Sequence, residues 1–119
     1  VRNRGTLGGN LASAAPYADV APALFVSDAV VELVSVSARR EVPIVDLFDG
    51  PRRTVLAADE LIARVRIPKR PGVRAAFLKL GQRQGLTVSK IAVAVAITFR
   101  DGRIVADAGI SVPSREAAA

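Results

Sequence analysis

The sequence contains no cysteine and no histidine. Without these side chains the chain cannot supply a zinc site of the usual kind, a thiolate nucleophile, an imidazole base or the ligands of its own iron–sulfur cluster. Disulfide bonds are excluded as well, so cysteine usage does not indicate a redox compartment. We therefore expect neither a catalytic side chain nor a metal ligand on this chain.

Aromatic side chains are scarce, and basic residues outnumber acidic ones, which gives a net charge of +6. A basic domain raises the possibility of nucleic-acid binding. The arginines are scattered, however, and the aromatic side chains do not alternate with them as stacking platforms would. Solvated arginines on strand faces are the simpler interpretation. A nucleic-acid-binding module stays open as an alternative, and contact with an anionic partner or a phosphorylated cofactor fits equally well.

Methionine is missing even at the first position, and Val1 stands directly inside what resembles a motif. We therefore expect the chain to be a piece of a longer protein. Its 119 residues, half of them apolar, suffice for about one globular domain with a modest core. Since no apolar run approaches the roughly 20 residues that span a bilayer, we expect no membrane span.

Near its start the chain contains the segment TLGGN, in which Gly8 and Gly9 are adjacent. An ordered glycine costs backbone entropy, so a pair of them marks a turn or a close approach to another group. A tight turn is the ordinary interpretation. The alternative is a loop whose backbone N–H groups face an anion. The residues alone leave both possibilities open.

Two short helices are predicted after this segment. The first covers Gly9–Ala15, beginning at the GGN turn and ending before Pro16, because a proline disfavours helical backbone in the residue that precedes it. The second covers Val20–Val26. Asp19 is its N-cap, and Pro22 is tolerated in its first turn.

Strands dominate the rest of the chain. Alternating β-branched residues predict a strand over Val30–Val36, and a short strand at Glu41–Val42 precedes a helical turn near Asp46. The segment ELIARVRIP alternates most cleanly. Its alternation predicts two faces, one formed by Leu61, Ala63, Val65 and Ile67 and the other by Ile62, Arg64 and Arg66.

The segment Lys69–Gly72 combines charge, proline and glycine, and predicts a boundary between a unit of residues 1–72 and a unit of residues 73–119. Three strands are expected beyond it, within Ala75–Arg83, Lys90–Phe99 and Ile104–Val112. Asp101 and Gly102 join the last two as a two-residue hairpin turn. The whole pattern predicts an α+β fold, with a mostly antiparallel sheet and short helices.

Four segments in order, RNRGTLGGNLASAAPYADVAPAL, RREVPIVDLF, TVLAADELIARVRIP and AAFLKLGQR, resemble the flavin-binding part of the molybdenum hydroxylases. This family includes xanthine dehydrogenase and the FAD-carrying medium subunit of aerobic carbon monoxide dehydrogenase. Each segment alone is weakly specific, but the order and spacing of the four are highly specific. The resemblance implies that residues 1–72 form the second FAD-binding subdomain, and that residues 73–119 supply the first strands of the C-terminal flavoprotein subdomain.

The resemblance also implies a set of cofactor-binding residues. The loop against the FAD pyrophosphate is formed by Thr6, Leu7, Gly8, Gly9 and Asn10. Bare glycines would let the backbone approach phosphate oxygens, and a helix that starts there would direct free N–H groups toward them.

Three further positions are assigned near the flavin nucleotide by the same resemblance: Asp19, Ile62 and Lys79. Each has an ordinary alternative. Asp19 could simply cap a helix, Ile62 could be a plain strand residue, and Lys79 could be an exposed strand lysine.

The function implied is that of an electron-transfer component of a molybdenum hydroxylase. FAD would receive electrons from [2Fe–2S] clusters in a small subunit, after oxidation of a substrate at molybdopterin in a large subunit. It would pass them to an external acceptor such as NAD, a quinone or oxygen. A cytoplasmic location and association with other chains are expected. The alternatives are a truncated fragment that binds no flavin and acts in subunit assembly, and the basic nucleic-acid-binding module.

Overall fold

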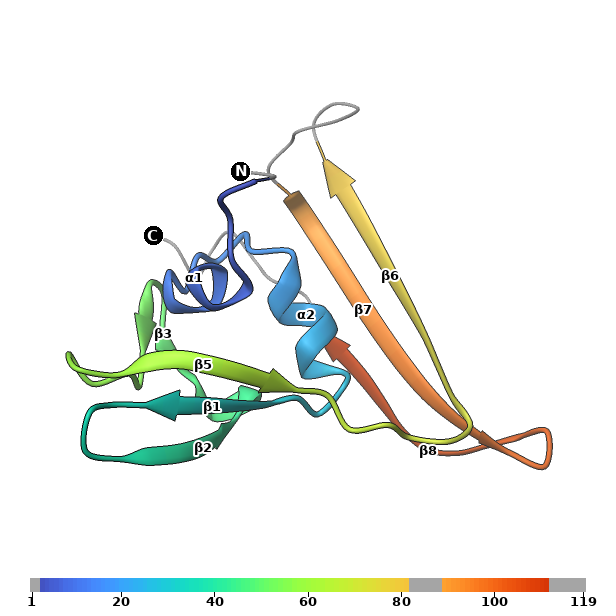
Figure 1. Ribbon diagram of the computed structural model, residues 1–119. Coiled ribbons are helices and arrows are strands. Elements are labelled where there is room, and N and C mark those ends of the chain that lie inside the picture. The colour runs from blue at the N-terminus through green and yellow to red at the C-terminus, as the bar shows by residue number, and fades with distance from the viewer. Residues whose placement is uncertain (1–2, 82–88, 112–119) are drawn as a thin grey trace.

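The computed structural model describes residues 3–81 and 89–111, which form two short helices and antiparallel sheets (Figure 1). The elements in chain order are α1 (Leu7–Ala12), α2 (Val20–Phe25), β1 (Val30–Val34), β2 (Arg39–Pro43), the 3-10 turn η1 (Ile44–Asp46), β3 (Phe48–Gly50), β4 (Arg53–Thr54), β5 (Leu61–Arg66), β6 (Val73–Gly81), β7 (Ser89–Arg100) and β8 (Arg103–Ser111). At six residues each, the two helices of the described ranges are too short to cross a bilayer.

Within the described ranges the strands form three sheets, and every pairing there is antiparallel. The first sheet has the order β2-β1-β5, a small ladder joins β3 to β4, and the third sheet has the order β6-β7-β8. Figure 1 shows α2 between the first sheet and the long strands of the third. The predicted α+β class with mostly antiparallel pairing is therefore confirmed.

The larger core lies between the inner face of the first sheet and the two helices. On β1, Val31 and Leu33 point inward and are fully buried, as the period of two in a strand requires. Leu11 from α1 and Leu24 from α2 cover them. A smaller core lies on the other side of α2, where Val26 contacts alanines of β7. Alanine side chains are small, so the helix can lie close to this sheet.

The strand β5 departs from the predicted alternation. Ile62 and Val65 were expected on opposite faces, but both pack against the larger core. The cause is a bulge: Glu32 of β1 pairs with Arg64, whereas the next residue, Leu33, pairs with Ile62. Ala63 is therefore an extra residue in β5 without a partner in β1. Because of this extra residue, Ile62 and Val65 lie on the same face of the sheet.

The predicted ends of two other elements are also wrong. The helix α1 begins at Leu7 rather than Gly9 and ends at Ala12 rather than Ala15. The strand β1 ends at Val34 rather than Val36, because Ser35 turns the chain and donates its backbone N–H to the carbonyl of Ala38 at 2.9 Å.

Other local predictions are confirmed. The second helix begins at Val20 with Asp19 at its N-cap position, and η1 forms the helical turn at Asp46. The hairpin turn has φ values of 51° at Asp101 and 75° at Gly102, as a type I′ turn requires. The predicted strand ends at positions 82–83 and 112 lie outside the described residues.

The connection from β5 to β6 is tied to the C-terminal end of α2. Arg70 donates to the carbonyl of Val26 at 2.6 Å and forms an ion pair with Asp28. Gly72 follows with a φ of +78°, and its carbonyl accepts the N–H of Phe99 at 2.9 Å. A Cβ at Gly72 would lie 2.4 Å from the carbonyl oxygen of Phe99, so only glycine fits here.

Two glycines with nearly equal backbone give a matched stability test. Gly102 has a φ of +75° and open space around a hypothetical Cβ, whereas Gly72 at +78° has the Phe99 carbonyl in the way. Gly102→Ala should cost about 1–2 kcal/mol from left-handed backbone alone. Gly72→Ala should cost about 1–3 kcal/mol more, because the carbonyl must move. Urea unfolding followed by far-UV circular dichroism measures both, and equal losses would contradict this account of the contact.

Charged residues fasten the loop before β5 to β2. The guanidinium of Arg40 donates to both carboxylate oxygens of Glu60, at 2.7 and 2.8 Å, and to the carbonyl of Val55 at 2.8 Å. Glu60 also accepts the backbone N–H of Ala57 at 2.8 Å. The Arg40 hydrogen bond first, and the Ala57 hydrogen bond second, lower the pKa of Glu60 from 4.5 to about 2.

Acid should therefore weaken this attachment over a defined interval. Because the pKa of Glu60 is depressed in the folded chain, its stabilisation is fully present above about pH 4.5 and is lost as the pH falls toward 2. The difference in unfolding free energy between the wild type and Glu60→Gln should shrink over that interval. Urea titrations at pH 7, 4 and 2.5 measure it. Arg40→Met should remove the larger part of this pH dependence and leave the part due to the Ala57 N–H. A difference in unfolding free energy that stays constant with pH would contradict the assignment.

Candidate functional site

The TLGGN segment forms the beginning of α1. Thr6 is the N-cap, with extended backbone, and its hydroxyl oxygen accepts the N–H of Gly9 at 3.0 Å. Its carbonyl accepts the N–H of Asn10 at 3.0 Å. The N–H groups of Leu7 and Gly8, in the first turn, have no partner within the helix. Two backbone donors, with the hydroxyl hydrogen of Thr6, are therefore available to an anion at this end.

The glycines also serve contacts within the protein. A Cβ at Gly8 would lie 3.4 Å from the carbonyl oxygen of Ile62 and 3.5 Å from its Cβ. A Cβ at Gly9 would lie 3.0 Å from the capping hydroxyl of Thr6. The sequence suggested that bare glycines serve the approach of a ligand. The structure adds two internal reasons, because the first turn of α1 packs closely on β5 and closes its own cap.

Asn10 supplies a buried polar atom that lacks a partner. Its Oδ1 is shielded from solvent and makes no hydrogen bond within the described ranges. A buried polar atom left in this condition costs about 1–3 kcal/mol. Because this oxygen is an acceptor, only a donor from outside the described residues would complete it and recover this cost.

Asp19 and Lys79, 60 residues apart, meet directly. The ammonium of Lys79 on β6 donates to Oδ2 of Asp19 at 2.5 Å. Asp19 stands at the N-cap position of α2, yet its side chain makes no capping hydrogen bond. A capping hydrogen bond therefore does not account for this carboxylate. Lys79 is exposed on its strand, as the ordinary alternative predicted, and it also forms this ion pair.

The eight residues assigned from the sequence thus fall into two contacting groups. The loop from Thr6 to Asn10 meets Ile62 through Gly8, and Asp19 meets Lys79. No described contact joins the first group directly to the second. The first group offers two backbone N–H groups and a hydroxyl, which are suited to a negatively charged ligand such as a diphosphate, whereas the pair of Asp19 and Lys79 carries one charge of each sign.

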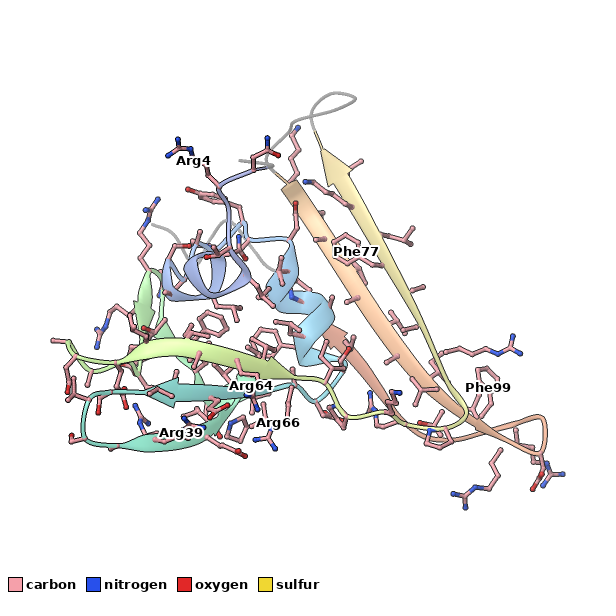
Figure 2. All side chains as sticks on the ribbon, in the orientation of Figure 1. Arg4, Arg39, Arg64, Arg66, Phe77 and Phe99 are labelled. Atoms are coloured by element: carbon pink, nitrogen blue, oxygen red, sulfur yellow. The ribbon has the colours of Figure 1, made fainter. Side chains whose placement is uncertain are left out.

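Phe77 was not among the residues assigned from the sequence. It lies two positions before Lys79 on β6, so both side chains share one face of the third sheet. Phe77 pairs with Ala94 of β7, and its ring is 42% exposed (Figure 2). The signal in the sequence was this spacing of two on a predicted strand.

Comparisons with known proteins agree on one family. The model described as "FAD binding domain in molybdopterin dehydrogenase" matches residues 1–70. The nicotinate dehydrogenase FAD-subunit of Eubacterium barkeri is 38% identical over 109 residues, covering 87% of this chain and 36% of that protein. The nicotine 6-hydroxylase medium subunit of Paenarthrobacter nicotinovorans is 48% identical over 71 residues, covering 60% of this chain and 25% of that protein.

A solved structure agrees in fold. The reconstituted CO dehydrogenase from Oligotropha carboxidovorans contains a chain that matches with a TM-score of 0.85 and 32% identity. The match covers 94% of this chain and 39% of that chain, so the present chain spans well under half the length of these relatives. The comparisons favour neither the flavin-free assembly fragment nor the nucleic-acid-binding module.

The unpartnered carboxamide of Asn10 predicts an unusual stability result. Asn10→Leu replaces a polar group by an apolar one of similar shape, so the free energy of unfolding without ligand should stay unchanged or rise by about 1 kcal/mol. Ser27→Ala is the contrasting variant. The Ser27 hydroxyl donates to the carbonyl of Ala23 at 2.7 Å, so its loss should cost about 1 kcal/mol. Urea unfolding measures both, and a clear loss of stability in Asn10→Leu would show that the carboxamide has a partner.

Proposed function

The chain belongs to the family of FAD binding domains in molybdopterin dehydrogenases, and we propose that it holds FAD in the electron-transfer subunit of a molybdenum hydroxylase. The resemblance indicated by the sequence is thereby confirmed, with FAD as the cofactor of the family. The single observation that carries the proposal is the family match over residues 1–70, which takes in the whole TLGGN loop. The open donors at the start of α1 support it.

Each residue of the loop has a distinct role in this proposal. The N–H groups of Leu7 and Gly8 would donate to pyrophosphate oxygens, and the glycines leave that approach free of side chains. The Thr6 hydroxyl accepts from Gly9 and can still donate its hydrogen outward. The amide nitrogen of Asn10 would donate to a pyrophosphate oxygen, whereas its Oδ1, an acceptor, would need a hydroxyl or amino group of the cofactor as its donor.

Three positions outside the loop complete the proposed site. Ile62 supports the first turn of α1 from β5 through its contact with Gly8. Lys79 would bring a positive charge toward the anionic parts of the cofactor. Asp19 forms an ion pair with the ammonium of Lys79. In this arrangement residues 1–72 form the FAD-binding subdomain, and residues 73–119 begin the next one.

The electron route is part of the proposal. FAD, when bound, supplies the redox chemistry, and the chain supplies binding, orientation and electrostatics. The chain has no cysteine, which is consistent with [2Fe–2S] clusters housed in a small subunit and molybdopterin in a large one. Relatives are named as an FAD-subunit and a medium subunit, which supports such a division. The external acceptor would be NAD, a quinone or oxygen, and the assembly would be cytoplasmic.

A cofactor titration tests the proposal. FAD and riboflavin are added separately to the 119-residue chain, and flavin fluorescence reports binding. FAD should bind at least about 100-fold more tightly than riboflavin, because riboflavin lacks the diphosphate and loses charge-assisted hydrogen bonds to the loop. Asn10→Leu should weaken FAD binding by about tenfold. A folded chain that binds neither flavin, or both equally, would contradict the proposed role of the loop.

A further inference from the structure

Three cations at one end of the third sheet are not neutralised by the fold. Seven other cations of the described residues form ion pairs with carboxylates. Arg74, Arg100 and Arg103 are exposed, and no carboxylate of residues 3–81 or 89–111 lies within ion-pair distance of them. All three lie near the turn from β7 to β8, and Figure 1 shows this turn projecting beyond the helices. The positive charge there is open to a partner.

Two of these arginines face each other across the hairpin. Arg100 of β7 is directly opposite Arg103 of β8. Side chains of directly opposite residues are neighbours on one face of a ladder, and like charges in this position destabilise it. The turn itself needs only Asp101 and Gly102, which have the backbone that a two-residue turn requires. The formation of the hairpin therefore does not explain the pair of arginines.

Apolar side chains lie beside this charge. Phe99 pairs with Ile104 across the same hairpin, and the two are 36% and 66% exposed. The guanidinium carbon of Arg74 lies 5.7 Å from the centre of the Phe99 ring, a cation–π contact that leaves the N–H groups free to donate (Figure 2 labels Phe99). An open hollow at the turn is bordered by Arg100, Arg103 and Ile104, together with Asp101. Arginine and aromatic side chains are enriched where proteins contact one another.

We propose that this hairpin patch, formed by Arg74, Phe99, Arg100, Arg103 and Ile104, docks a partner subunit through an acidic surface with an apolar centre. A carboxylate between the two facing guanidiniums would accept charge-assisted hydrogen bonds from both and remove their repulsion. The inference rests on the proposed function in one respect, namely that an electron-transfer subunit works beside partner subunits. The patch contains none of the residues assigned to FAD.

An acidic protein surface fits the patch better than a nucleic acid does. Asp101 places a carboxylate at the turn, where it would repel a row of phosphates. Ile104 offers no ring on which a base could stack, and one face of the Phe99 ring is covered by Arg74. Carboxylates that alternate with apolar side chains would meet the arginines and Ile104 together.

Peptide binding tests the patch. The probes are a short fluorescein-labelled peptide of glutamates and leucines, and the same peptide with every glutamate replaced by glutamine. Fluorescence anisotropy at low ionic strength, where charge attraction is least screened, measures their binding to the 119-residue chain. The acidic peptide should bind at least about tenfold more tightly than its glutamine counterpart. Arg100→Gln should weaken its binding by about tenfold, and Ile104→Ser by about threefold. Arg4→Gln removes an exposed arginine outside the patch and should change it by less than about twofold.

Stability and binding should change in opposite directions in a second variant. Arg103→Glu places a carboxylate opposite Arg100, so an attractive pair replaces a repulsive one across the ladder. The urea midpoint of the chain should therefore rise, whereas binding of the acidic peptide should weaken by at least about tenfold. A purely structural role for Arg103 would lower the midpoint instead.

Four outcomes would overturn the inference. They are equal or absent binding of the two peptides, a loss in Arg4→Gln as large as that in Arg100→Gln, a lower urea midpoint in Arg103→Glu, and tighter binding of single-stranded DNA of the same length than of the acidic peptide. Circular dichroism identifies any variant that does not fold, and Arg100→Gln then replaces Arg103→Glu. Failure of the proposed function has a different signature, because the wild type would bind the acidic peptide but not FAD.

Discussion

The packing of a single short helix between two sheets constrains the rest of the structure. Leu24 of α2 enters the larger core, and Val26, the residue that follows the helix, contacts the alanines of β7 on the other side. The helix and its C-cap residue thus serve two hydrophobic cores. Both ends of this helix are tied down by charged groups, through Lys79 at the start and Arg70 at the end. The elements that carry the candidate site, α1 and β6, are therefore both connected to α2.

Local patterns predicted most of this frame. Alternation located β1 and β5, the Asp-Gly pair located the turn between β7 and β8, and the Asp19 position located the start of α2. The misses have physical causes. The helix α1 starts early because Thr6 caps it, and a threonine three residues before Gly9 was the available signal. The bulge in β5 follows from pairing with β1, which a pattern within one strand does not contain.

Local patterns did not predict the residues of the candidate site. Its residues were assigned through a family resemblance, since a pair of glycines by itself fits a turn as well as an anion loop. No local pattern indicated that Asp19 would contact Lys79, 60 residues away, because this contact depends on how β6 lies against the helices. Nor did it indicate that Gly8 packs against Ile62. Long-range contacts of this kind depend on the tertiary arrangement, whereas turns and caps depend on neighbours in the chain.

The distribution of satisfied and open polar groups separates the site from the rest of the described surface. Glu32, the buried carboxylate of β1, lies 2.8 Å from Arg39 and 3.6 Å from Arg64, and Glu60 is held by Arg40. These acidic groups are engaged within the fold. At the start of α1 the first-turn N–H groups have no partner in the helix, and the Oδ1 of Asn10 is buried without one. An open polar group disfavours the fold that contains it, so the start of α1 differs from the rest of the described surface in leaving both donors and an acceptor without a partner.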